Sequence, residues 1–156
     1  MDLKVIQKHL VINLIDQPTR LSAACRIPNK NPDTIVKAIL KVLIGVYGAT
    51  EKFHTDNGCE FVNQSLIDLA HQFGICISTT AAYAPLANGT IERHNKVLGV
   101  MVEKVLADTK CHFDIALVWS LNAKNSLANV HGFSPFQLGL GRNPKLPNVL
   151  SDKPLH

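Results

Sequence analysis

The stretch Lys52-Phe53-His54-Thr55-Asp56-Asn57-Gly58 says most about how the chain folds. Its side chains alternate as they do in a β-strand, and the strand ends at the turn signal Asn-Gly, which leaves Asp56 at the strand end. A second segment, Asn88-Gly89-Thr90-Ile91-Glu92-Arg93-His94-Asn95, predicts a turn that feeds the first turn of a helix carrying Glu92. Carboxylates placed in this way can share a divalent cation. Two metal ions held by carboxylates are the usual equipment for cutting and joining phosphodiesters.

The composition predicts one globular domain. The chain has 156 residues, of which 46% are hydrophobic and 18% charged, so it is folded rather than disordered. Its net charge of +4 is compatible with a polyanionic partner, although many domains carry as much. The longest apolar stretch, residues 38–46, is broken by Lys41, so we expect no membrane span.

The cysteines and the N-terminus indicate the compartment. Four cysteines are scattered without a Cys-x-x-Cys pair, which argues against a zinc finger and against a disulfide framework. Met1-Asp2-Leu3-Lys4 carries an acid and lacks a long apolar core, so it is not typical of a secretory signal. We therefore expect a reduced protein that is nuclear or otherwise intracellular.

Hydrophobic periodicity predicts five strands and four main helices. The expected strands cover residues 3–6, 10–15, 21–27, 51–55 and 75–79. The expected helices cover residues 32 or 33–46, 62 or 63–73, 89–107 and 114–129, the last capped by Asp114. Residues 81–88 are expected to form a loop, and residues 132–156 at most one short helix. The run Leu10 to Ile15 is almost entirely apolar, as in a strand buried on both faces.

The order of these elements predicts the architecture. Three strands joined by short turns must be antiparallel, and strands 4 and 5, each entered through a helix, must be parallel crossovers. We therefore expect an α/β fold in which strands 1–3 are antiparallel, strands 4 and 5 run parallel to strand 1, and helices flank a mixed five-stranded sheet. This is the plan of the ribonuclease H-like fold.

Hairpin geometry selects a third acid. If Gln7-Lys8 is the turn, Asp2 faces Asn13, and Asp16 lies three residues further on, roughly 10 Å along the strand. Strands 1 and 4 are parallel, so we expect Asp2 and Asp56 at the same edge of the sheet and Asp16 at the other. We interpret Asp16 as a turn residue whose side chain bonds to nearby backbone.

These residues resemble a known family. Asp2, Asp56 after 53 intervening residues and Glu92 after 35 more are similar to the D-D-E core of retroviral and retrotransposon integrases. The phrases at residues 52–61, 79–95 and 132–138 resemble the same family, in the same order. The resemblance covers nearly the whole chain, so residues 1–147 are expected to form an integrase catalytic core-like domain and residues 148–156 a tail or linker.

The resemblance implies a reaction and a set of ligands. It implies DNA end processing and strand transfer, with two Mg²⁺ or Mn²⁺ ions held by Asp2, Asp56 and Glu92. DNA is the implied partner, and a homodimer is implied by family analogy. Lys96 and Asn95 lie one turn beyond Glu92 and are candidate nucleic-acid-binding residues, as are Asn57 and Asn88. Two of them have a plainer interpretation: Lys96 as a solvated surface lysine, and Asn57 as a residue needed only for the turn.

Three departures from the family pattern favour an alternative. Strand 1 has only Met1 ahead of Asp2, so its first half is expected to be missing and both neighbouring strands to lack partners. Cys59 stands where the family has glycine, and it would be strained if the site needs a positive φ. By the same resemblance, we expect an excised mobile-element fragment without the flanking domains of integrases. The alternative is therefore an inactive, domesticated DNA- or protein-binding domain of this fold. A ribonuclease H acting on RNA–DNA hybrids would also fit the fold, but not the phrase at residues 132–147.

Overall fold

The structure is a computed structural model, and it describes residues 1–56, 58–79, 85–127 and 131–145. The strands are β1 (Asp2–Ile6), β2 (His9–Ile15), β3 (Ser22–Ile27), β4 (Lys52–Thr55) and β5 (Cys76–Thr79). The helices are α1 (Pro32–Ile39), the π-helical segment η1 (Leu40–Ile44), α2 (Gly45–Tyr47), α3 (Gln64–Phe73), α4 (Pro85–Thr109), α5 (Phe113–Ser126) and α6 (Pro135–Leu140). The predicted order of strands and helices is confirmed.

The first three strands form an antiparallel meander in the order β1-β2-β3. The turn at Gln7 and Lys8 has φ of 48° and 68°, the left-handed pair that a tight hairpin needs. The observed register pairs Ile6 with His9 and Asp2 with Asn13. The sequence prediction of the hairpin register is therefore confirmed.

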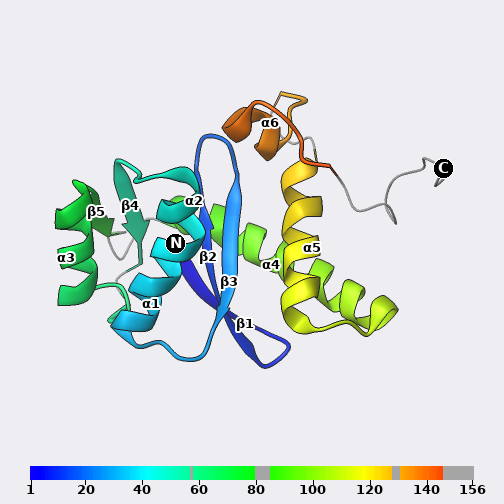
Figure 1. The fold of residues 1–156 in the computed structure, drawn as a ribbon, viewed down its shortest axis with the longest axis horizontal. Helices are drawn as coiled ribbons and strands as arrows, with labels where there is room; N and C mark the ends of the chain where they lie inside the picture. The colour runs from blue at the N-terminus through cyan, green and yellow to red at the C-terminus, as the bar shows by residue number, and fades with distance from the viewer. Residues whose placement is uncertain (57, 80–84, 128–130, 146–156) are drawn as a thin grey trace.

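The five strands do not form one sheet. β4 and β5 pair in parallel as a separate two-stranded sheet, and Figure 1 shows this pair beside the meander, flanked by α3. Within the described ranges, a hydrogen bond from the Met1 nitrogen to the His54 carbonyl, 2.7 Å away, joins the start of the meander to β4. Met1 already lies level with His54, so β1, which runs from Asp2 to Ile6, meets only the end of β4, and the two strands form no ladder in the described residues. The prediction of a single mixed five-stranded sheet was wrong for this reason.

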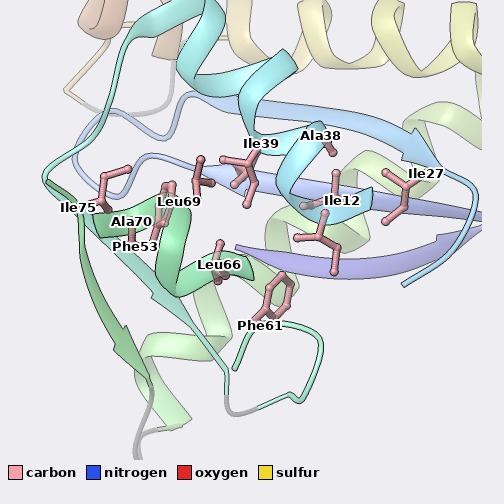
Figure 2. Close-up of a cluster of buried hydrophobic side chains, with 12 residues drawn as sticks. Ile12, Ile27, Ala38, Ile39, Phe53, Phe61, Leu66, Leu69, Ala70 and Ile75 are labelled. Carbon is pink, nitrogen blue, oxygen red and sulfur yellow. The ribbon is translucent and has the colours of Figure 1, made fainter. Parts of the chain in front are cut away.

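Two apolar clusters lie on opposite faces of β2. The first packs the meander against α1, α3 and β4, and Figure 2 shows its centre. It contains Ile12, Leu14, Ile27, Ile35, Ala38, Ile39, Phe53, Phe61, Leu66, Leu69, Ala70 and Ile75. The second packs the other face against α4 and α5, and it contains Ile6, Val11, Leu98, Val102, Phe113, Ala116, Leu117 and Leu121. β2 is thus buried on both faces, as its apolar run predicted.

The first predicted helix is interrupted by a wider turn. α1 continues into the π-helical segment, and the Gly45 N–H bonds to the Leu40 carbonyl. Gly48, with φ of 87°, ends the helical run where the sequence predicted its end. α3 begins after Asn63, whose side chain accepts from the Leu66 N–H, and ends at Gly74 in the left-handed conformation.

The last two long helices begin earlier than predicted. α4 starts at Pro85, so the expected loop over residues 81–88 was wrong from residue 85 onward, and residues 81–84 lie outside the described ranges. A proline has no N–H to satisfy and therefore fits the first helical position. α5 starts at Phe113 with His112 as its N-cap, so Asp114 lies inside the first turn and does not cap the helix. Its carboxylate instead pairs with Arg26, 2.9 Å away.

The short helix expected in the last part of the chain is α6. It begins with a capping box in which the Ser134 hydroxyl accepts from the Gln137 N–H and the Gln137 side chain accepts from the Ser134 N–H. The expected tail at residues 148–156 lies outside the described residues. In the part that is described, the helices are too short or too polar to cross a bilayer.

Candidate functional site

A cavity of about 770 Å³ lies between the two sheets. Leu14 and Ile15 of β2 line it together with residues 52–55 of β4. Asp2, Asp56 and Glu92, the three acids predicted from the sequence, also line this cavity. Residues separated by 53 and then 35 intervening positions are therefore brought to one hollow, with β1, the end of β4 and α4 each contributing one carboxylate.

Asp56 is the exposed acid that follows β4. Its Oδ1 accepts from the Gly58 N–H at 3.1 Å, so the acid is held by the turn that ends its own strand. A Cβ at Gly58 would lie 3.0 Å from Asp56 Oδ1 and 2.8 Å from Glu60 Oε2. A side chain at residue 58 would therefore have to displace the carboxylates of Asp56 and Glu60, which lie close to the Gly58 backbone.

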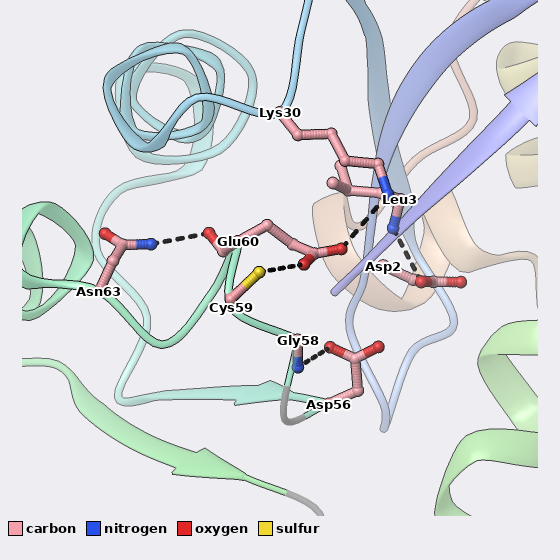
Figure 3. Close-up of polar contacts among 8 residues, drawn as sticks. All are labelled: Asp2, Leu3, Lys30, Asp56, Gly58, Cys59, Glu60 and Asn63. Atoms are coloured by element: carbon pink, nitrogen blue, oxygen red, sulfur yellow. Dashed lines mark hydrogen bonds and ion pairs between the residues drawn. The ribbon is translucent and has the colours of Figure 1, made fainter.

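The loop after Asp56 is anchored through Glu60, a residue that carries no motif signal of its own (Figure 3). Glu60 pairs with Lys30 at 3.5 Å and accepts from the Cys59 thiol at 3.6 Å, while its carbonyl accepts from the Asn63 side chain. A hydrogen bond from its own backbone N–H is the main cause that lowers the pKa of Glu60. Cys59 is not among the described residues with positive φ, so the strain expected there is not found.

Asp2 is partly buried, and both of its carboxylate oxygens accept hydrogen bonds. Oδ1 accepts from the Leu3 N–H at 2.8 Å, and Oδ2 accepts from the Asn95 side chain at 2.5 Å. Burial is the main cause that raises the pKa of Asp2. The Leu3 N–H opposes this increase, and the negative charge of Asp56 adds to it. Asp2 and Asp56 therefore lie within electrostatic reach of each other.

The nitrogen of Met1 lies near the same two charges. Burial is the main cause that lowers the pKa of this terminal ammonium, and the charges of Asp2 and Asp56 act to raise it. Since the nitrogen also donates to the His54 carbonyl, it is fixed beside the two acids. The Met1 nitrogen therefore lies where β1 approaches β4.

Glu92 lies on α4, further into the helix than predicted. Because α4 begins at Pro85, Glu92 is about two turns inside it, where it is exposed and lines the cavity. Lys96, one turn later, is exposed and available to a ligand. Asn95 is only 2% exposed, and both its donor and its acceptor are used inside the protein. Its burial gives it a structural place beside Asp2, and the predicted DNA contact stays a prediction.

Two predicted contacts fall outside the described side chains. Asn57 lies outside the described residues, and for Asn88 the structure gives the backbone in α4 but not the side chain. Asp16 also lines the cavity, but its Oδ2 is engaged in its own turn by the Thr19 N–H at 3.1 Å and the Thr19 hydroxyl at 2.6 Å. The interpretation of Asp16 as a turn residue is confirmed.

The three carboxylates are the right kind of ligand for Mg²⁺, but they lie too far apart in this structure to hold one ion together. Carboxylate oxygens are the ligands that Mg²⁺ prefers. Within the described ranges, however, no group of three histidine, cysteine, aspartate or glutamate side chains lies close enough together to hold a metal ion. Asp2 and Asp56 interact electrostatically, whereas Glu92 shares the cavity with them from a separate helix.

A buried basic group lies on α5, apart from the acids. Lys124 is 6% exposed, and its ammonium donates to the Ser22 hydroxyl at 2.6 Å. Asn125 bonds both the N–H and the carbonyl of Ser22. Burial lowers the pKa of Lys124 to about 8. Burial, followed by the charges of Lys124, Arg20 and Arg93, lowers the pKa of His94 to about 4.

A protein family and a curated relative both match this chain. A family model described as "Integrase core domain" matches residues 1–85, more than half of the chain. The retrovirus-related Pol polyprotein from transposon 412 of Drosophila melanogaster is 31% identical over 139 residues. This alignment covers 87% of the chain and 11% of the polyprotein, so the chain spans about a tenth of that relative.

Two solved structures share the fold. The catalytic core domain of BIV integrase superposes with a TM-score of 0.80 at 25% identity, covering 90% of this chain and 91% of that one. The HTLV-2 integrase catalytic core domain, solved in complex with magnesium in a dimeric form, superposes with a TM-score of 0.74 at 20% identity. That match covers 88% of this chain and 90% of the HTLV-2 chain. The four cysteines of the present chain are free.

Proposed function

The chain belongs to the integrase core domain family, and we propose on this basis that it is a metal-dependent DNA strand transferase core. The observation that carries the proposal is the shared cavity: Asp2, Asp56 and Glu92 line one hollow although they come from three separate elements. The proposed substrate is a DNA end, and the proposed reaction is its cleavage and its joining to a second DNA.

Asp2 and Asp56 are the proposed ligands of the first ion, and Glu92 is the proposed third ligand. Burial raises the pKa of Asp2, and repulsion from Asp56 raises it further, so a divalent cation placed between the two acids would remove that repulsion. Each carboxylate oxygen has a second lone pair, so the hydrogen bonds to Asp2 leave room for a ligand. When bound, Mg²⁺ or Mn²⁺ would activate the attacking oxygen and stabilise the leaving one.

Exposed cations would hold the DNA. Lys96 lies one turn from Glu92 on α4 and is exposed, so its ammonium can contact a backbone phosphate near the metal ligands. We also propose that the chain acts as a homodimer, supported by the dimeric form of the HTLV-2 core, and that it works in the nucleus.

A second candidate is a binding domain that has lost activity. It is favoured by the absence, within the described residues, of a three-ligand group, and by the separation of β4 and β5 from the meander. On this hypothesis the chain, with its net charge of +4, binds DNA or a protein, and the acids hold no metal. The two candidates share the fold, so only a functional measurement separates them.

An oligonucleotide strand-transfer assay tests the proposal. We expect product with Mg²⁺ or Mn²⁺ and about a hundredfold less, or below, with Asp56→Asn or Glu92→Gln, since each change removes a charged ligand. Asp16→Asn is the matched control, because Asp16 lines the same cavity but is engaged in its own turn. Equal rates in wild type and in all three variants would refute the proposal. A folded protein without product and without a Mg²⁺-dependent thermal shift would favour the binding domain.

A further inference from the structure

A buried amide pair links Asp2 to two other elements. Asn13 of β2 is 1% exposed and Asn95 of α4 is 2% exposed. The Asn13 Nδ2 donates to Asn95 Oδ1 at 2.6 Å, and the Asn95 Nδ2 donates to Asp2 Oδ2 at 2.5 Å. Asn13 is also the cross-strand partner of Asp2 in the β1–β2 ladder. Two residues far apart in the sequence thus form one chain of hydrogen bonds that ends on the acid.

Asp2 sets the direction of these bonds, and Asn13 completes them. The carboxylate of Asp2 can only accept, so the NH₂ group of Asn95 must face it. This orientation turns the Asn95 carbonyl toward β2, where it needs a donor. Asn13 supplies that donor through its Nδ2. Without a donor at residue 13, the Asn95 carbonyl would lose its described partner, and the amide would be held at its Asp2 end alone.

Stability alone does not explain an amide at residue 13. Its Oδ1 is buried, and among the described residues no partner bonds to it. A buried acceptor without a partner is unfavourable, whereas an apolar side chain would suit a face that also carries Val11 and packs against α4. Violations of this kind are expected where a residue serves a site rather than the core.

We propose that Asn13 is a positioning residue that acts through Asn95 to orient Asp2. The proposal rests on the proposed function in one respect, namely that Asp2 is a metal ligand. Asn13 does not touch the ligand itself. Its amide fixes the Asn95 amide, and the Asn95 N–H holds one oxygen of Asp2 so that the remaining lone pairs face the cavity.

The pKa of Asp2, measured by carboxyl ¹³C NMR on the whole chain, tests the proposal without requiring activity. Asn13→Leu should raise this pKa, because the Asn95 N–H is then no longer held in place against the charged form of Asp2. Asn95→Leu should raise it at least as much. The double variant should match Asn95→Leu alone, because Asn13 then has nothing to act through. Asn13→Ala serves the same purpose if leucine prevents folding. Asn125→Leu, which removes a buried asparagine that bonds Ser22, is the control and should leave the pKa of Asp2 in place.

Two outcomes would overturn the proposal. One is an unchanged pKa of Asp2 in both Asn13 variants. The other is an equal shift from Asn13→Leu in the wild-type and Asn95→Leu backgrounds, which would show that Asn13 acts independently. A Mg²⁺ titration then separates the two proposals: if Asp2 is a ligand, Asn13→Leu should weaken Mg²⁺ binding about 10- to 100-fold. A pKa shift as expected, in a wild-type protein that binds no Mg²⁺, would uphold the positioning role and refute the strand-transferase proposal alone.

Discussion

Replacing Lys124 with methionine should change the pH dependence of stability in a calculable way. Lys124 is buried, and its described partner is the neutral hydroxyl of Ser22. Burial lowers its pKa from 10.5 to about 8. Below pH 8 the lysine is protonated in both the folded and the unfolded chain, so the folded protein bears the whole desolvation penalty. Between pH 8 and 10.5 the unfolded chain binds more protons, so the stability of the wild type rises with pH.

The size of the effect follows from the two pKa values. The difference between 10.5 and about 8 corresponds to at most about 3 kcal/mol. Methionine fills similar space but loses the hydrogen bond to Ser22, which is worth about 1 kcal/mol. At pH 7 we therefore expect Lys124→Met to be more stable than the wild type by about 2 kcal/mol, and above pH 10.5 to be less stable by about 1 kcal/mol.

Urea unfolding followed by the fluorescence of Trp119, the single tryptophan, measures this difference. The free energies of unfolding of the two proteins should cross between pH 8 and 10.5, under reducing conditions that keep the four cysteines free. Lys104→Met, which removes an exposed lysine of α4, should show no such crossing. A difference between wild type and Lys124→Met that stays constant from pH 7 to 10.5 would show that burial does not lower the pKa of this lysine.

Two further predictions concern α4 and the junction between η1 and α2, where Gly45 lies. The pKa of His94 is lowered to about 4, so between pH 6.5 and 4 the unfolded chain binds more protons, and the free energy of unfolding should fall as the pH falls. His94→Gln should make this fall shallower in unfolding curves measured at acid pH. The same dependence of stability on pH in wild type and variant would contradict the prediction. A Cβ at Gly45 would lie 2.9 Å from the Leu40 carbonyl oxygen, so Gly45→Ala should destabilise by about 1–3 kcal/mol, whereas Gly99→Ala, with open space, should stabilise by up to about 1 kcal/mol. Thermal melts of both variants measure these changes in stability. If Gly45→Ala raised the melting temperature, the close approach of residue 45 to the Leu40 carbonyl in the π-helical segment would not require glycine.

Local rules were enough to predict the meander. A two-residue turn fixes hairpin register, so the position of Asp2 opposite Asn13 follows from the turn residues alone. The apolar run of β2 and the turn chemistry of Asp16 are local in the same sense. The start of α4 was also a local question, but Pro85 fits both a loop and a first helical turn, and the prediction of a loop was wrong.

Non-local pairing could not be predicted in the same way. Whether β4 joins β1 depends on how many residues of each strand can face the other, and this number is set by the whole packing. The burial of Asn95 shows a second limit of prediction from sequence. A residue three positions after Glu92 is rotated by about 60° from it around the helix axis, and one four positions after by about 40° in the other direction. The first rotation carries Asn95 toward the core with Leu98, while the second leaves Lys96 exposed.

The start of β1 gathers features that stability alone does not favour. Asp2 is partly buried near a second carboxylate, and its pKa is raised by that burial and by Asp56. The amide that supports it depends on Asn13, whose Oδ1 has no partner in the described part of the chain. An apolar residue at 13 and an amide at 2 would remove both unfavourable features. A divalent cation would remove the repulsion between the two carboxylates, and the hydrogen bonds to Asp2 would then orient a metal ligand. If Asp2 and Asp56 hold a metal ion as proposed, the same arrangement that weakens the isolated fold prepares it for that ligand.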